Sequence, residues 1–187
     1  YTVTLSGTPV DFTINKLAVT VSADAKSKTY GSDDPELTYS VTSGALKSGD
    51  SFAGTLSRTT GDSVGTYVIN KGTLDNSNYT ITFVGANLTI SKRAVTVTAD
   101  AKSKTYGDVD PSLTYQLTGS LKSGDAFTGA LARVAGENAG EYNITQGTVA
   151  LNSNYTITFV GAKFTINGVT VTVTPVIGQQ AEIGSGY

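Results

Sequence analysis

The chain has 187 residues, with 13 Lys and Arg against 15 Asp and Glu, no Cys, His, Met or Trp, and 21 Gly. Without thiolates or imidazoles it lacks the commonest nucleophiles, general bases and zinc ligands, and its near-neutral charge is unlike that of nucleic-acid binders, which need a basic surface. No apolar run approaches the length of a membrane span. We therefore expect a non-enzymatic segment with no cofactor, no nucleic-acid partner and no membrane insertion.

An internal repeat organises the sequence. The segment AVTVSADAKSKTYGSDDPELTY at 18–39 returns as AVTVTADAKSKTYGDVDPSLTY at 94–115, and 48 of 72 aligned residues of the two copies are identical. Self-similarity of this kind indicates tandem copies of one structural unit. The expected domains are the tail of a preceding repeat at 1–17, two complete repeats at 18–93 and 94–168, and the start of a following module or a terminal strand at 169–187.

Strands are predicted in each repeat by alternation of apolar and polar residues. In the first repeat the predicted strands cover 19–24, 37–41, 52–56 and 67–69, and a closing hairpin joins 79–84 to 88–90 through Gly85-Ala86-Asn87. The second repeat copies each element. The segments 46–50 and 121–125 could each form one helical turn, and a plain turn is an equal alternative because of their Gly-Asp ending.

The apolar residues of these strands form one face, which we expect to be the core. In the first repeat this face comprises Val19, Val21, Leu37, Tyr39, Leu46, Phe52, Leu56, Tyr67, Ile69, Tyr79, Ile81, Phe83, Leu88 and Ile90. The second repeat has the matching set 75 or 76 positions later. A unit of this size is near the lower limit at which one core is sufficient.

The connectors between units are short and equal in length. They are Asn15–Ala18, Ser91–Ala94 and Asn167–Thr170, and none contains Pro. Strand is therefore predicted to run almost directly into strand, which favours a semi-rigid joint between repeats over a flexible linker.

Four motifs occur in the same order in both repeats: K-T-Y-G with a following D-P and L-T-Y, then G-D-x-F-x-G, G-x-Y-x-I-x-x-G-T and N-Y-x-I-x-F-x-G. In these motifs the sequence resembles the MBG domain family of the Tyr-Gly-x type over 18–90 and 94–166. Such modules occur in tandem in large bacterial surface and secreted adhesin-like proteins. The resemblance implies a β-grasp-like fold and an extracellular location. The strand pattern itself predicts an all-β or β-rich domain with at most a short helix and leaves an Ig-like β-sandwich open.

Two tyrosines are candidates for ligand binding. Tyr30 and Tyr106, each followed by Gly, could present an aromatic surface to a sugar ring. The favoured interpretation is that each tyrosine lies at the edge of the core, with the glycine in a turn of positive φ.

Acidic loop residues are candidates for calcium binding, because carboxylates in loops are typical Ca²⁺ ligands. These are Asp33, Asp34, Asp108 and Asp110. The second repeat has fewer oxygens in this loop, and neither loop has EF-hand spacing. The prediction is therefore that no metal binds and that the shared Asp-Pro stabilises a turn.

Four lysines lie beside the shared acids Asp24 and Asp100. They are Lys26, Lys28, Lys102 and Lys104. A cross-link from Lys to Asn, assisted by a buried acid, is conceivable in an adhesin. The alternating Lys-Ser-Lys pattern favours solvated side chains.

The expected function is a non-catalytic stalk or spacer in a bacterial extracellular adhesin-like protein, with neighbouring repeats of the same chain as partners. One alternative is a module that itself binds cell-surface glycans or mucin. Another is a fibre subunit, in which a terminal strand such as 170–177 pairs with the sheet edge of another copy.

Overall fold

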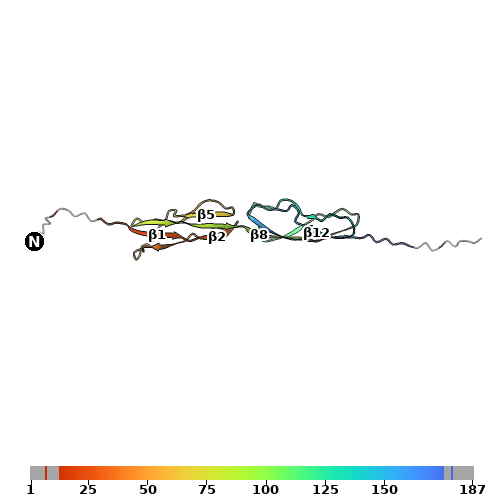
Figure 1. Cartoon of the computed structure of the whole chain (residues 1–187), viewed down its shortest axis with the longest axis horizontal. Helices are drawn as coiled ribbons and strands as arrows, with labels where there is room; N and C mark the ends of the chain where they lie inside the picture. Colours follow the sequence, from red (N-terminus) through yellow and green to blue (C-terminus); the bar gives the residue numbers. More distant parts are fainter. Residues whose placement is uncertain (1–6, 8–12, 175–177, 179–187) are drawn as a thin grey trace, which may run out of the picture. The chain divides into compact units, whose positions relative to one another are not determined.

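The computed structural model describes residues 7, 13–174 and 178, and every regular element in that part of the chain is a β-strand (Figure 1). The first repeat contains β1 (Leu17–Ala23), β2 (Lys26–Thr29), β3 (Tyr39–Ser43), β4 (Ser57–Arg58), β5 (Gly65–Asn70), β6 (Tyr79–Val84) and β7 (Ala86–Ser91). The second contains β8 (Arg93–Ala99), β9 (Lys102–Thr105), β10 (Tyr115–Thr118), β11 (Ala132–Arg133), β12 (Gly140–Thr145), β13 (Tyr155–Val160) and β14 (Ala162–Asn167). The all-β expectation is confirmed. The segments 46–50 and 121–125 form turns.

In each repeat the first two strands lie beside the last two, in two separate sheets. In the first repeat β1 pairs with β6 and β2 pairs with β7, both in parallel. The register is the same in both ladders, since Ser22 faces Val84 and Lys26 faces Leu88, a separation of 62 residues in each case. The antiparallel strand β3 flanks β1, while β5 and then β4 flank β7. The described part of each repeat therefore consists of two small sheets and no helix.

The predicted closing hairpin is wrong. The strands β6 and β7 lie in different sheets, β3-β1-β6 and β2-β7-β5-β4, and Gly85 carries the chain from one to the other without reversing it. Gly-Ala-Asn is typical of a turn, but a glycine is needed here for a different reason. A Cβ at Gly85 would lie 2.9 Å from the Ile69 carbonyl oxygen. A Cβ at Gly161 would likewise lie 2.8 Å from the Ile144 carbonyl oxygen.

One other strand prediction also needs correction. The segment 52–56 is not a strand. It makes one isolated bridge, Ala53 to Asp75, and pairing resumes only at β4. The Lys-Ser-Lys segment around Lys28 is the edge strand β2, which makes backbone hydrogen bonds to β7.

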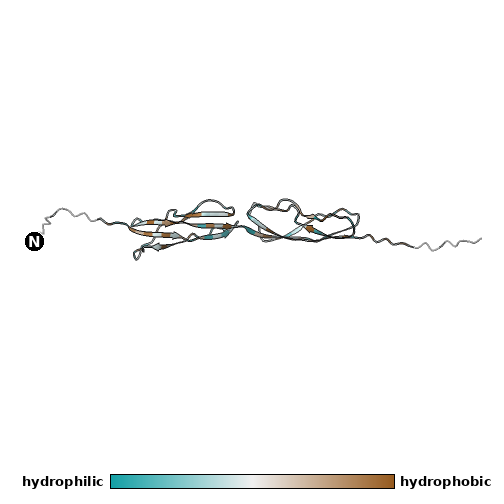
Figure 2. Ribbon diagram, viewed as in Figure 1, coloured by the Kyte–Doolittle hydropathy of each residue, from teal (hydrophilic) through white to brown (hydrophobic). Residues whose placement is uncertain are grey.

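The core contains most of the expected residues. Val21, Leu56, Ile69, Leu74 and Leu88 form one buried cluster, against which partly buried residues pack, among them Leu37, Phe52, Tyr67, Ile81 and Phe83. Figure 2 shows hydrophobic positions recurring along the strands. Tyr39 is partly exposed instead of buried, and the loop residues Leu74 and Val149 are buried although no strand pattern marks them. In the second repeat the cluster is Ala99, Ile144, Phe164 and Ile166.

Only Lys92 separates β7 from β8, as the short connector predicted. By internal contacts the chain divides into two compact units. The first comprises the described residues up to Val95 together with 119–127 and 151–158, and the second comprises 96–118, 128–150 and the described residues from 159 onward. Residues 168–174 carry no strand, and most of the expected preceding tail and of 175–187 lies outside the described residues.

Replacing Gly85 by Ala should destabilise the first repeat by about 1–3 kcal/mol, because the new methyl group would overlap the Ile69 carbonyl. Gly65→Ala is the matched control. Gly65 also lies in a strand, its Cβ would meet only ordinary contacts at 3.8 Å or more, and the substitution should be neutral or stabilise by about 0.4–1 kcal/mol. Urea unfolding followed by circular dichroism measures both. Equal effects of the two substitutions would contradict the close approach at Gly85.

Candidate functional site

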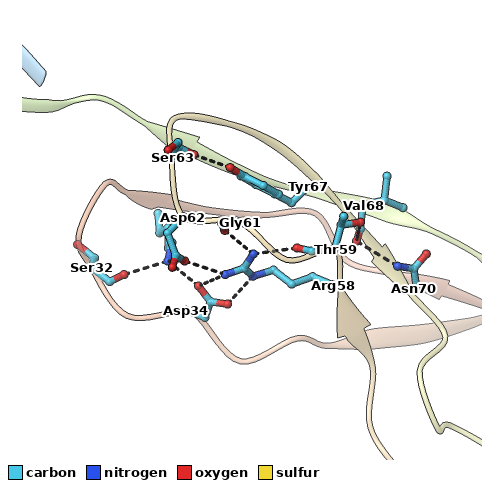
Figure 3. Close-up of polar contacts among 11 residues, drawn as sticks. Ser32, Asp34, Arg58, Thr59, Gly61, Asp62, Ser63, Tyr67, Val68 and Asn70 are labelled. Carbon is cyan, nitrogen blue, oxygen red and sulfur yellow. Dashed lines mark hydrogen bonds and ion pairs between the residues drawn. The ribbon is translucent and has the colours of Figure 1, made fainter. Parts of the chain in front are cut away.

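A cluster of charged side chains joins β2, β4 and the acidic loop of the first repeat. The Arg58 guanidinium forms a two-point contact with Asp34, through Nε at 2.5 Å and Nη2 at 3.1 Å. Arg58 also donates from Nη1 to the carbonyl oxygens of Thr59 and Gly61, and Nη2 contacts Asp62 at 3.2 Å. Figure 3 shows Arg58 between the two acids. Lys28 completes the cluster, with Nζ 2.6 Å from Asp34 Oδ1.

The second repeat contains the same cluster. Arg133 holds Asp110 through Nε at 2.5 Å and Nη2 at 3.1 Å, and Lys104 Nζ lies 2.7 Å from Asp110 Oδ1. Glu137 replaces Asp62 and contacts both cations at 2.5 Å. Two-point arginine–carboxylate contacts fix geometry as well as charge. The cluster thus fastens the acidic loop to the sheet in both repeats.

The expectation of solvated lysines is wrong for two of the four. The side chains of Lys28 and Lys104 are only 8% and 5% exposed. Their stems lie against the sheet, and their ammonium groups reach the acids. A charge so little exposed needs a partner, and these carboxylates provide it.

Three acids of the two clusters, Asp34, Asp110 and Glu137, have lowered pKa values. Hydrogen bonds first from Arg133 and then from Lys104 lower the pKa of Asp110 to about 2. Arg58 and Lys28 lower the pKa of Asp34 in the same way, and Lys104 and Arg133 lower that of Glu137. The acids are therefore ionised over the whole physiological range.

The four acids considered for calcium have different surroundings. Asp34 and Asp110 are bound by Arg and Lys in the two charged clusters. Asp33 is exposed, and Asp108 Oδ2 accepts a hydrogen bond from the Thr105 amide at 3.3 Å. Among the described residues no group of three or more acidic side chains is arranged to hold a metal ion.

The other acids shared by the two repeats also bind within the fold. Thr38 donates to Asp24 at 2.5 Å and Thr114 donates to Asp100 at 2.6 Å. The Tyr79 hydroxyl donates to Asp50 at 2.6 Å and accepts from the Lys47 amide at 2.8 Å, and the Asp50 contact raises the Tyr79 pKa.

In the second repeat Tyr155 occupies the place of Tyr79. Its hydroxyl donates to Asp125 at 2.7 Å and accepts from the Lys122 amide at 2.8 Å. Burial is the first cause of the raised Tyr155 pKa, and the Tyr155 hydroxyl is the first cause of the lowered pKa of Asp125. In both repeats the Lys-Ser-Gly-Asp turn is therefore held against the start of the last long strand.

Tyr30 belongs to a second buried cluster within the first compact unit. Only 6% exposed, it packs with Ile90, Val95 and Tyr155, and its ring meets that of Tyr155 edge-on at 5.5 Å and 81°. Lys122 Nζ lies 5.1 Å from the Tyr30 ring centroid, within cation–π range. Arg93 Nε donates to the Tyr30 carbonyl at 2.7 Å and Nη1 donates to Ser120 Oγ at 2.8 Å.

Tyr106, the equivalent residue of the second repeat, is 54% exposed. Both following glycines have positive φ, 77° at Gly31 and 91° at Gly107, as the turn interpretation required. The two Tyr-Gly ends therefore share a backbone and differ in what covers the ring.

Sequence reasoning missed Arg58, Arg133, Arg93 and Lys122. A signal for the first two was present, because the chain has only three arginines and two of them occupy equivalent positions in the repeats. The only acid that both repeats retain in the Tyr-Gly loop is the one that each arginine binds.

These features define a tandem all-β repeat, each copy fastened by one arginine–aspartate contact. The family model described as MBG domain (YGX type) matches residues 19–89 and 95–165. The chain belongs to this family, whose domains occur in surface proteins. No curated protein matches the chain. Along the part of the chain that the structure describes, no helix has the length and apolar character needed to cross a bilayer.

Acid should weaken the second repeat through Asp110. Its pKa is near 4 when unfolded and about 2 when folded, so its contribution to stability is complete above about pH 4 and is lost as the pH falls toward 2. Asp110→Asn should lower the melting temperature at pH 7 and reduce the further loss between pH 4 and 2. Thermal melts at several pH values measure both effects.

The control for this experiment is Asp33→Asn, in the exposed part of the equivalent loop. It should leave the melting temperature and its pH dependence nearly unchanged. If Asp110→Asn retains the full acid sensitivity of the unmodified chain, Asp110 is not the group responsible.

Proposed function

We propose that the chain is a non-catalytic spacer segment of a bacterial extracellular adhesin-like protein, in which successive repeats are held together at the Tyr-Gly end of the preceding one. The observation that carries the proposal is the buried cluster around Tyr30. It draws Tyr155, Lys122 and Phe127, all from the second repeat, into one compact unit with the first. A flexible tether would need no such cluster.

The inventory of acids supports a structural role. Catalysis by carboxylates needs acids directed into a cleft with suitably tuned pKa values. The three acids shared by the repeats each bind a partner of the fold instead: Asp24 binds Thr38, Asp34 binds Arg58, and Asp50 binds Tyr79. Their equivalents in the second repeat do the same.

The test measures whether the two repeats hold a fixed distance. The chain has no Cys, so spin labels can be attached at Val84→Cys and Val160→Cys, equivalent exposed strand positions. Pulsed electron paramagnetic resonance should give one narrow distance distribution, and insertion of Gly-Ser-Gly-Ser after Lys92 should broaden it. If the distance distribution is already broad without the insertion, the two repeats are joined by a flexible tether and the spacer proposal is wrong.

Tyr30→Ala should broaden the same distribution and lower the melting temperature. An aromatic pair contributes about 0.5–1.5 kcal/mol beyond the area that it buries, and about 1 kcal/mol moves the midpoint of a domain of this size by about 4–8 °C. Tyr106→Ala is the matched control, because it removes the same side chain from the exposed end, and it should change neither quantity. Equal effects of the two substitutions would count against the cluster as a joint.

Direct glycan binding is a second candidate, favoured by one feature. An open recess in the second compact unit is lined by Phe159 and Ile144 together with the polar side chains of Asn143, Gln146 and Lys163. An aromatic ring beside a few polar groups suits a sugar. A glycan array probed with the chain and with Phe159→Ala decides this point. If the original chain binds a glycan and Phe159→Ala does not, the glycan function is favoured. If the original chain binds no glycan, only the spacer function remains.

A further inference from the structure

The tyrosine rings at the two Tyr-Gly ends differ in burial although their local backbone structure is the same. The Tyr30 amide donates to Ser91 O at 2.9 Å and the Tyr106 amide donates to Asn167 O at 2.8 Å, so both tyrosines follow the edge strand in the same way. Tyr30 is 6% exposed and Tyr106 is 54% exposed. The difference therefore arises from the groups that lie on the tyrosine and not from the repeat itself.

The cover of Tyr30 consists of a defined set of groups. The Tyr155 ring and the Lys122 ammonium lie on the Tyr30 ring. The neighbouring Asn154 binds the first repeat at another point, where its Oδ1 accepts a hydrogen bond from the Val64 amide at 2.9 Å. We call this set, Lys122, Asn154 and Tyr155, the front of a repeat. The first repeat has the same groups at Lys47, Asn78 and Tyr79, with the same hydroxyl contacts.

The space around Gly31 and Gly107, which follow the two tyrosines, differs in the same way. A Cβ at Gly31 would lie 3.1 Å from Lys122 Cβ and 3.5 Å from Arg93 Nη2, whereas a Cβ at Gly107 would meet nothing within 4 Å. Positive φ already requires glycine at both sites. At Gly31 the close approach of a front is an additional reason, and at Gly107 the space for such an approach is open.

The chain beyond the second repeat points to the occupant. Val171 and Val173 align with Val95 and Val97, and the same Val-Thr alternation continues to Thr174. Val95 is 2% exposed within its sheet, whereas Val171 is 79% exposed. Residues 171–174 thus keep the alternation that predicts a strand, although they form none here.

We propose that the Tyr106 end is a docking surface for the front of a following β module, whose first strand is formed by residues 171–174. That module supplies a lysine and a tyrosine to the Tyr106 ring, as Lys122 and Tyr155 do to Tyr30. The proposal rests on the proposed spacer function and extends it to the next joint. An occupant in the same chain is favoured because its first strand is already attached, which gives a high effective concentration at the surface.

The second joint lacks one contact of the first. Arg93, which donates to the Tyr30 carbonyl and to Ser120, aligns with Val169. The Tyr106 carbonyl therefore has no equivalent arginine at its own connector. The second joint should therefore lack the arginine contacts of the first, and Val169→Arg should strengthen it.

The experiment lengthens the chain by one module. Residues 1–170 are followed by a second copy of 95–167, and spin labels are placed at Val160→Cys and at the matching residue of the added copy. We expect a narrow distance distribution that Val169→Arg narrows further and Tyr106→Ala broadens. The amides of Val171 and Val173 should exchange freely in the original chain and be protected in the lengthened one, which reports folding of the added module independently.

Several results would overturn the proposal. A broad distribution between these labels, or one that Tyr106→Ala leaves unchanged, means that the surface does not dock a following module. If the original chain forms dimers on size-exclusion chromatography and Tyr106→Ala abolishes them, the surface binds a second copy of the chain. If the original chain binds a sugar and Tyr106→Ala abolishes that binding, the surface is a glycan site. The label pair at 84 and 160 reports only the first joint. If that pair stays narrow while the new pair is broad, this proposal fails and the spacer function does not.

Discussion

The parallel pairing of the first two strands with the last two is the constraint on which the rest of each repeat depends. Parallel neighbours cannot be joined by a tight turn and need a long crossover connection. In the first repeat that connection is the whole stretch from Tyr30 to Asn78, which contains β3, β4, β5 and the loop residue Leu74. In most folds such a crossover is a helix. Here it is built of short strands and turns, which need fastening one by one.

The charged cluster and the Tyr79 hydroxyl supply that fastening. Arg58 binds Asp34 in the loop after β2 and the Gly61 carbonyl in the loop after β4. One guanidinium therefore holds two loops of the crossover in place. Tyr79 holds the Lys-Ser-Gly-Asp turn to the start of β6. Polar contacts of this kind contribute little each, but their positions are distributed along the crossover. Both sets recur in the second repeat.

Sequence patterns predicted the strands well where one face is buried. The alternation of Val and Thr placed β1 and β8, and the Tyr-Ile-Phe alternation placed β6 and β13, within a residue or two. Pairing partners were not predictable in this way. Gly85-Ala86-Asn87 has the residues of a turn, and only the proximity of Ile69, a distant residue, distinguishes a straight crossing from a hairpin. Leu74 was missed because it lies buried in a loop without periodicity.

The candidate site was predicted less well, for a related reason. Lys28 and Lys104 sit in a Lys-Ser-Lys pattern that favours solvent. Each is paired with an acid six positions further on, but the arginine that holds this acid comes from a later strand, so no local pattern marks the cluster. Tyr30 and Tyr106 have nearly identical neighbours in sequence. Tyr30 is buried by residues more than 50 positions further along the chain, among them Tyr155, so no pattern in the local sequence could separate the two tyrosines.

The same parallel pair has a mechanical consequence. If a repeat is pulled by its two ends, the load enters at the start of β1 and leaves at the end of β7. Because β1 runs parallel beside β6 and β2 runs parallel beside β7, the pull slides the first two strands along the last two and loads both ladders of hydrogen bonds together, in shear. An antiparallel terminal pair pulled in this way would open one bond at a time. Each repeat is thus arranged to resist stretching along the direction in which the chain continues.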